Sequence, residues 1–310
     1  MSSSPETRKQ AAKKPPKNRF IQQELPAWKP ILTPGWVLFI LFGIAAVFIP
    51  IGAVCLQASR SVVEIYHRYD TCLEGTDDGA RERVLQQANG EGLYCAPVQL
   101  TVPADMYGPV YLYYELGNFY QNHRRYVKSR SHAQLRGEDV PAEELGVCAP
   151  QQYLGGDETK PINPCGLTAW SYFNDTFELN RCAGAGCEAL PNAVAVSTEG
   201  IAWESDVGSK FGAQRAENFN PPGPLRGGAT VLGPIDQDER FVVWMRTAAL
   251  PRFRKLWGYV PAPASGPTLR AGEAVRLRVL NRYNTYGFGG SKAFVLSTAS
   301  WLRGRNEFLR

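Results

Sequence analysis

The stretch "AVRLRVLNRY", residues 274–283, alternates apolar and basic side chains and indicates the fold class. Val275, Leu277 and Val279 are separated by Arg276 and Arg278, so one face of an extended chain is apolar and the other is charged. This alternation predicts a half-buried antiparallel strand. Further strand-like runs, each bounded by turn residues, are "PVYLYYEL" (109–116), "AVAVST" (193–198), "RFVVWMRTA" (240–248) and "KAFVLSTAS" (292–300).

Helical periodicity in the same part of the chain is brief. It occurs in "SVVEIYHRY" (61–69) and in "NFYQNHRRYVKSR" (118–130). Short strands separated by loops rich in Gly and Pro are typical of all-β domains. We therefore predict a mainly-β domain, an antiparallel β-sandwich with helical and loop insertions.

An uncharged segment, "PGWVLFILFGIAAVFIPIGAVCL" (34–56), lies before these strands. At 1.5 Å per residue, a helix over residues 36–56 is about 31 Å long, which matches the hydrocarbon core of a bilayer. A cleaved signal peptide is the alternative, but the apolar run is too long for one and no A-x-A cleavage site follows it. We predict a transmembrane helix over 34–57, with a kink at Pro50.

The positive charge of the chain is concentrated before this helix. Residues 1–30 hold seven of the 34 Lys and Arg residues and two of the 29 Asp and Glu residues, which leaves 27 of each sign in the remainder. A neutral remainder disfavours a broadly basic nucleic-acid-binding domain. Since basic flanks stay in the cytosol, residues 1–33 are predicted to be a cytosolic tail and 58–310 a luminal or extracellular domain.

Cysteines and a glycosylation motif agree with this topology. Cys55 lies in the apolar segment, and the other six follow it: Cys72, Cys95, Cys148, Cys165, Cys182 and Cys187. An even number of cysteines on the predicted luminal or extracellular side, which is oxidising, suggests three disulfides. Six cysteines allow 15 different pairings. The absence of any C-x-x-C spacing disfavours a zinc site. "NDT" (174–176) is an N-glycosylation acceptor, which places a glycan on Asn174.

Catalytic patterns are scarce in the sequence. The chain has three histidines, no G-x-S-x-G elbow and no phosphate-binding loop. "DQDE" (236–239) offers Asp236 and Asp238 as ligands for a divalent cation and a nucleotide-sugar phosphate. That gives one enzymatic alternative, a single-span luminal glycosyltransferase. We favour a polar turn at this position and expect no metal site and no cofactor.

Two stretches combine basic and aromatic residues. Drawn as a helix, 118–130 places Phe119, Tyr126 and Val127 on one side and, on the other, Arg124, Arg125 and Lys128. The charged side is either a solvated face or a surface that meets a partner. "RFRKLWGYV" (252–260) is predicted to be a solvated edge with buried Phe253 and Trp257.

Long strings of the sequence resemble a known family. They are "NRFIQQELPAWKPILTPGWV" (18–37), "VVEIYHRYDTC" (62–72), "PVYLYYELGNFYQNHRRYVKSRSHAQLRG" (109–137), "PCGLTAWSYFNDTF" (164–177), "VVWMRTAALPRFRKLWG" (242–258) and "NRYNTYGFGGSKAFVLSTASWLRGRNEFL" (281–309). They are similar to the cell division control protein 50 / ligand-effect modulator 3 family, the accessory β-subunits of phospholipid flippases, and in particular to the plant-type ALA-interacting subunits.

The resemblance implies a non-catalytic partner of a type-four P-type ATPase, which moves phospholipids to the cytosolic leaflet. Such subunits support exit of the ATPase from the endoplasmic reticulum and its activity there, in the Golgi and at the plasma membrane. They have two membrane helices flanking a glycosylated, disulfide-linked β domain. No second apolar run of about 20 residues occurs in this sequence, so the second membrane helix of the family is absent from it.

The resemblance also implies roles for individual residues. It pairs Cys72 with Cys95 and Cys148 with Cys165, and it places the glycan on Asn174. Cys182 and Cys187 are an addition to the family pattern and are left to pair with each other. For Arg124, Arg125 and Lys128 a solvated face is the default interpretation, and the functional hypothesis is that they meet acidic luminal loops of the ATPase.

Overall fold

The computed structural model describes residues 18–21, 23–27, 33–182, 193–221 and 228–299. The chain divides into two compact units, Met1–Ala53 and Val54–Arg310. The described residues of the second unit are called the globular domain below. Cys187 lies outside the described residues, and so does its predicted pairing with Cys182.

Helix α1 runs over Pro34–Arg60 and carries the uncharged segment. Among the described residues, it is the one helix that is long and apolar enough to cross a membrane, and no part of its most apolar 18-residue window is buried. Pro50 lies inside it. An exposed apolar helix of 27 residues is a candidate membrane span, because such a surface is unfavourable in water.

The first sheet of the globular domain has the strand order β1 (Glu64–Arg68), β8 (Ser291–Ser297), β4 (Val110–Gly117) and β6 (Phe253–Val260). All three strand pairs are antiparallel. The central strands β4 and β8 include Leu112, Leu116 and Phe294, which are fully buried. The strands predicted at 109–116 and 292–300 are therefore confirmed, the second one ending at Ser297.

The second sheet is built around the alternating stretch 274–283. Strand β7 (Ala274–Asn281) pairs antiparallel with β5 (Thr176–Arg181) on one side, and with β2 (Leu93–Tyr94) and β3 (Val98–Thr101) on the other. Its apolar residues Val275, Leu277 and Val279 are buried, as the alternation predicts. Each such side chain contributes about 1.5–3 kcal/mol by leaving water.

The apolar faces of the two sheets contribute to one core. The ring of Phe177 on β5 lies 5.1 Å from that of Phe294 on β8 and 5.3 Å from that of Trp257 on β6. The mainly antiparallel β prediction is thus confirmed. The disulfides Cys72–Cys95 and Cys148–Cys165 join the same pairs that the resemblance implies.

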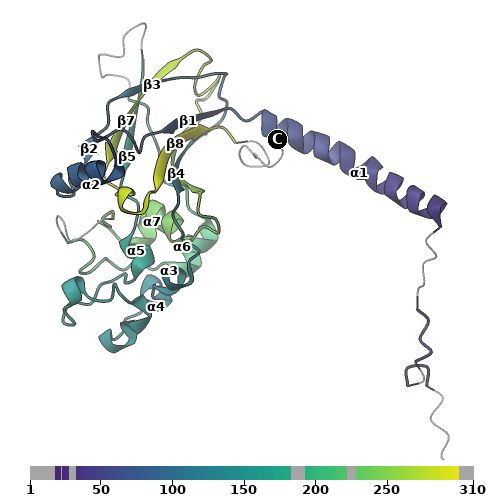
Figure 1. The fold of residues 1–310 in the computed structure, drawn as a ribbon, viewed down its shortest axis with the longest axis horizontal. Helices are drawn as coiled ribbons and strands as arrows, with labels where there is room; N and C mark the ends of the chain where they lie inside the picture. Colours follow the sequence, from purple (N-terminus) through teal and green to yellow (C-terminus); the bar gives the residue numbers. More distant parts are fainter. Residues whose placement is uncertain (1–17, 22, 28–32, 183–192, 222–227, 300–310) are drawn as a thin grey trace, which may run out of the picture. The chain divides into compact units, whose positions relative to one another are not determined.

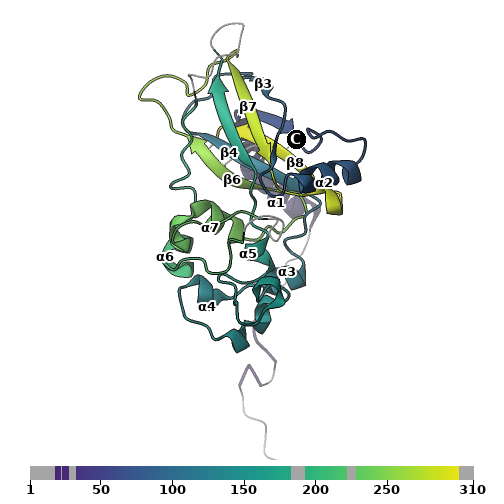
Figure 2. The ribbon, with the colours of Figure 1, turned by 90° about the vertical axis from the view of Figure 1, so that its left-hand side faces the viewer.

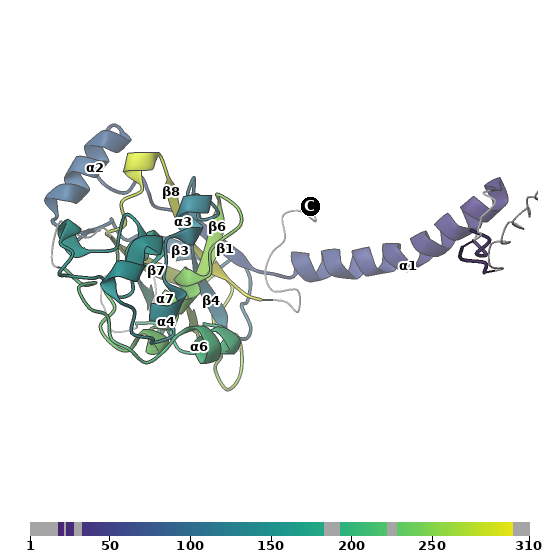
Figure 3. The same cartoon turned by 90° about the horizontal axis from the view of Figure 1, so that it is seen from below.

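Short helices gather at one end of the sheets, as Figures 1 and 2 show for α3 to α7. Helix α2 lies apart from that group (Figure 3). Asp77 caps α2 through a hydrogen bond from Ala80 N to its side chain, 2.7 Å long. The bounds are α2 Asp78–Gln87, α3 Arg124–Lys128, α4 His132–Leu135, α5 Leu167–Trp170, α6 Glu204–Lys210 and α7 Glu239–Met245, with 3-10 helices η1 Ala142–Cys148, η2 Leu154–Gly156, η4 Ile235–Gln237 and η5 Tyr286–Phe288.

The strand predicted at 240–248 is wrong, because this stretch forms helix α7. Phe241, Trp244 and Met245 are buried and stand at positions i, i+3 and i+4, which is helical spacing. Asp238 starts the helix, since its Oδ1 accepts a hydrogen bond from Phe241 N at 3.0 Å. A cap and a buried helical face together outweigh the strand propensity of the Val and aromatic residues.

Two further predictions are corrected. The brief helix predicted at 61–69 is instead strand β1, which pairs with β8 along Glu64–Arg68. The strand predicted at 193–198 forms only isolated bridges, Asn180↔Ala193 and Ser197↔Tyr259. This segment passes from the edge of one sheet to the edge of the other, so it cannot pair along its length with either.

Candidate functional site

Helix α3 presents three basic side chains to solvent. Arg124, Arg125 and Lys128 are exposed, and among the residues that the structure describes none of them makes an ion pair within 4 Å. We call these three residues the basic surface. The helix predicted over 118–130 is limited to Arg124–Lys128, but the three basic residues share an exposed face as expected.

The opposite side of α3 is held firmly against the domain. The hydroxyl of Tyr126 lies 2.7 Å from that of Ser171, and the hydroxyl of Thr168 donates to Tyr126 O. Phe119, in the loop before α3, meets the Tyr126 ring edge to face at 5.8 Å. Burial raises the pKa of Tyr126 to about 12. These contacts fix the direction in which the basic surface faces.

A close backbone approach ties the end of α3 to the Cys148–Cys165 disulfide. The buried hydroxyl of Ser129 donates to Cys148 O at 2.9 Å and accepts from Leu167 N at 2.8 Å. Gly166 has φ +102°, and a Cβ there would lie 2.1 Å from Ser129 O. Only glycine fits at this position, which explains the "PCGL" string of the sequence.

The glycosylation motif lies at the start of β5. Asn174 is half-buried and lines a cavity of about 260 Å³, and its Oδ1 is buried without a hydrogen-bond partner among the described residues. Thr176 is the first residue of β5. The structure therefore places the acceptor asparagine at a recess and not on an extended loop.

Asp175, the middle residue of this motif, is fully buried and lies at the centre of a polar network. It accepts hydrogen bonds from Tyr69 OH at 2.8 Å and from the backbone N–H groups of Arg282 and Tyr283, both at 2.6 Å. Lys292 Nζ lies 2.9 Å from Asp175 Oδ2, and both side chains have no exposed area. Burial lowers the pKa of Lys292, although Asp175 favours its charged form.

The acidic pair that suggested a metal site lies elsewhere in the domain. Asp238 caps α7 and also accepts from Tyr172 OH at 3.0 Å. Asp236 belongs to η4, the short turn before α7. No group of three or more potential metal ligands occurs among the described residues. The interpretation of 236–239 as a turn is correct, although it leads into a helix and not into a strand.

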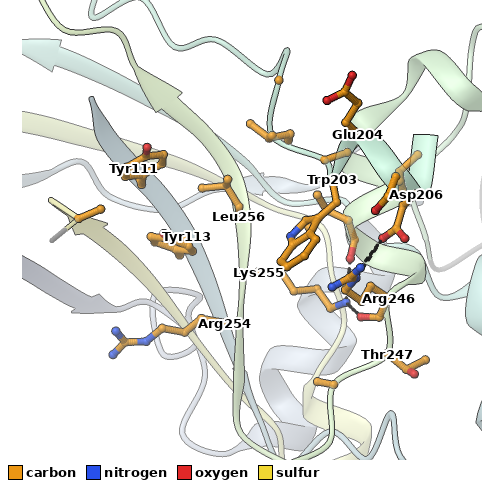
Figure 4. A pocket seen from close by; sticks show the side chains of 18 residues that line it. Tyr111, Tyr113, Trp203, Glu204, Asp206, Arg246, Thr247, Arg254, Lys255 and Leu256 are labelled. Carbon is orange, nitrogen blue, oxygen red and sulfur yellow. Dashed lines mark hydrogen bonds and ion pairs between the residues drawn. The ribbon is translucent and has the colours of Figure 1, made fainter. Parts of the chain in front are cut away.

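A pocket of about 750 Å³ lies between the first sheet and helices α6 and α7 (Figure 4). Tyr111, Tyr113 and Leu256 line it from the sheet. Facing them, the Arg246 guanidinium lies 4.3 Å from the ring centre of Trp203 and 2.9 Å from a carboxylate oxygen of Asp206. This pocket cannot be found from the sequence, because its walls come from five separate segments of the chain.

Lys255 lines this pocket and is buried, although the stretch 252–260 was predicted to be a solvated edge. Its Nζ donates to Val243 O, Trp244 O and Arg246 O at 2.5–3.0 Å and so satisfies carbonyls at the end of α7. Burial lowers the pKa of Lys255 to about 7. The sequence did hold a signal for this position. Lys255 lies two residues after the buried Phe253, and residues i and i+2 of a strand share a face.

Comparison with known proteins gives a consistent result. The family model described as "LEM3 (ligand-effect modulator 3) family / CDC50 family" matches residues 55–310. The chain is 45% identical to ALA-interacting subunit 3 of Arabidopsis thaliana, over 96% of this chain and 80% of that protein. It is 38% identical to cell cycle control protein 50A of Mus musculus, over 96% and 83%. It is 32% identical to the phospholipid-transporting ATPase accessory subunit CRF1 of Saccharomyces cerevisiae, over 97% and 80%.

Proposed function

The chain belongs to the CDC50/LEM3 family, and from this premise we propose that it is the non-catalytic β-subunit of a type-four P-type ATPase, a phospholipid flippase. The observation that carries the proposal is the match over almost the whole chain to relatives from a plant, an animal and a yeast. The yeast relative is named an accessory subunit of a phospholipid-transporting ATPase. The chain is therefore an accessory subunit that forms a heterodimer with the ATPase, and ATP hydrolysis is carried out by the partner.

The proposal includes a topology and a location. The basic tail 1–33 is cytosolic, α1 spans the membrane, and the globular domain, an antiparallel β-sandwich, lies in the lumen or outside the cell. The subunit works in the endoplasmic reticulum, the Golgi and the plasma membrane. The two disulfides fit an oxidising compartment, and we propose that Asn174 carries a glycan and that Cys182 pairs with Cys187.

The basic surface supplies a way to recognise the partner. Three exposed cations on a firmly held helix attract an acidic loop and orient it before contact. We propose that Arg124, Arg125 and Lys128 meet acidic luminal loops of the ATPase. The binding contributes to the folding of the ATPase, to its export from the endoplasmic reticulum and to lipid translocation.

Co-purification tests this function. The full chain, tagged and co-expressed with a type-four P-type ATPase, is recovered from mild detergent, and we expect the ATPase to be retained. A variant with Leu277→Asp in the buried centre of β7 serves as the misfolded control and should retain none. Failure of the folded wild-type chain to retain any such ATPase would refute the proposal.

A further inference from the structure

Three loops from distant parts of the sequence lie side by side next to α3. Asn118 donates its side-chain N–H to Phe288 O at 2.7 Å, and Asn122 donates to Ala249 O at 2.8 Å. Phe119 N donates to Pro251 O at 3.0 Å. The loops 118–122, 248–252 and 286–289 are thus joined by hydrogen bonds into one continuous surface.

Each loop exposes one large apolar side chain. Tyr120 is 56% exposed, Leu250 68% and Phe288 40%. We call these three residues the apolar cluster. Singly exposed apolar residues are ordinary, but a cluster presented by three connected loops is typical of an interaction site.

The loops are held together by contacts between aromatic rings around Phe119. The ring of Phe119 packs edge to face against Phe288 at 5.6 Å, against Trp244 at 5.9 Å and against Phe253 at 6.1 Å. Asn118 has φ +58°, a left-handed conformation that asparagine tolerates. The apolar cluster is therefore presented in a fixed arrangement, which lowers the entropy that binding must overcome.

The surroundings of the apolar cluster carry more positive than negative charge. The three loops and α3 contain the basic surface and Arg252 and no Asp or Glu residue, while the Glu82 carboxylate of α2 lies against Gly287 of the third loop. Arg252 is 70% exposed at its side chain and lies 3.4 Å from the buried carboxylate of Glu115. An occupant of this surface must therefore combine apolar side chains with negative charge.

We propose that the apolar cluster and the basic surface form one docking site for an acidic polypeptide segment of the ATPase that packs apolar side chains against the loops. This inference rests on the proposed function and adds the apolar half of the contact. Tyr, Phe and Arg are the residue types enriched in protein interfaces, and Lys is depleted there. The site has three Arg and one Lys beside its Tyr and Phe, so its composition favours a protein over an anionic membrane.

The test removes two side chains of the apolar cluster without changing the charge of the docking site. We expect the double variant Tyr120→Ser/Leu250→Ser, in the full chain co-expressed with the ATPase, to lower ATPase recovery about tenfold, as loss of central interface anchors does. The matched control is Tyr107→Ser/Leu232→Ser, which changes the same residue types at positions 62% and 87% exposed. The control should leave recovery unchanged, and both variants should keep the wild-type melting temperature.

The outcomes separate this inference from the proposed function. If the wild type retains no ATPase, the proposed function fails. If the wild type retains it and the double variant retains as much, only the docking site is refuted. If the double variant retains the ATPase but loses binding to added phosphatidylserine vesicles, the surface contacts membrane and the docking site is equally refuted.

Discussion

Two lysines are buried in the globular domain, and they obtain their hydrogen bonds in different ways. Lys292 has no exposed area and lies 2.9 Å from Asp175, with Asn281 Oδ1 and Tyr283 O as further acceptors. Lys255 is 6% exposed and donates only to backbone carbonyls at the end of α7. One lysine thus joins strands through an opposite charge, whereas the other completes a helix terminus.

The difference shows which of the two sites is more sensitive to substitution. Removing a partner from a buried ion pair leaves an unpaired charge, which costs more than leaving carbonyls without a donor. The Lys292 site also joins residues from the beginning, middle and end of the domain, whereas the Lys255 site joins α7 to the following strand. We therefore expect global loss of stability at the first site and a smaller, local effect at the second.

The largest effect is expected for Asp175→Asn, which keeps an N-x-T motif but leaves the Lys292 ammonium without its opposite charge. We expect the free energy of unfolding to fall by about 3–5 kcal/mol, measured by intrinsic fluorescence during denaturation of the full chain in detergent. The control Asp157→Asn makes the same change in an exposed pair with Lys160 and should lower the free energy of unfolding far less, because exposed ion pairs contribute little to stability. Equal effects of the two changes would contradict the comparison.

A smaller loss is expected for Lys255→Met, which keeps the aliphatic stem and removes the donor. Carbonyls at the end of α7 then lose their partner, and we expect a cost of about 1–3 kcal/mol in the same measurement. Lys160→Met, at an exposed position, is the control and should change stability by no more than about 0.5 kcal/mol. A cost for Lys255→Met as large as that of Asp175→Asn would show that opposite charge is not what distinguishes the two sites.

The pH dependence of stability sharpens the comparison further. Burial lowers the pKa of Lys255 to about 7, whereas the unfolded chain keeps an ordinary lysine pKa of about 10.4. Between these values the unfolded state binds more protons, so the free energy of unfolding should rise with pH from 7 to 9.5. The rise should be smaller in Lys255→Met, in which Lys292, whose pKa burial also lowers, still contributes. If the free energy of unfolding changes with pH in the same way in both proteins, Lys255 stays protonated over this range because its three carbonyl partners stabilise the charged form.

The smallest effect on stability is expected at the basic surface. Arg124→Glu/Arg125→Glu/Lys128→Glu changes exposed side chains and should alter the free energy of unfolding by no more than about 0.5 kcal/mol. The same variant should lower recovery of the ATPase, because like charges then face its acidic loops. The control Arg83→Glu/Arg215→Glu/Arg270→Glu makes an equal charge change at exposed positions elsewhere. If both triple variants lower recovery equally, net charge and not the basic surface is responsible.

The strands with clear alternation or long apolar runs could be predicted from the sequence, and α7 could not. In β7 the apolar and charged residues alternate with a period of two, which fits a strand and not a helix. In 240–248 continuous apolar residues fit a strand or a helix equally, and the cap from Asp238 decides between them. The basic surface was predictable because it lies within one short helix. The apolar cluster and the pocket were not, because tertiary contacts bring their residues together.

The network at Asp175 has a consequence for the order of events during synthesis. Its donors Arg282 and Tyr283 lie 107 and 108 residues after it in the chain, and the strand that pairs with β5 is β7. Neither the network nor β5 can form until nearly the whole domain has left the ribosome. A motif that stays unfolded for that interval remains open to the transferase that adds the proposed glycan, and the recess around Asn174 closes only afterwards. The time at which β7 is synthesised thus sets how long the motif before β5 stays open to modification.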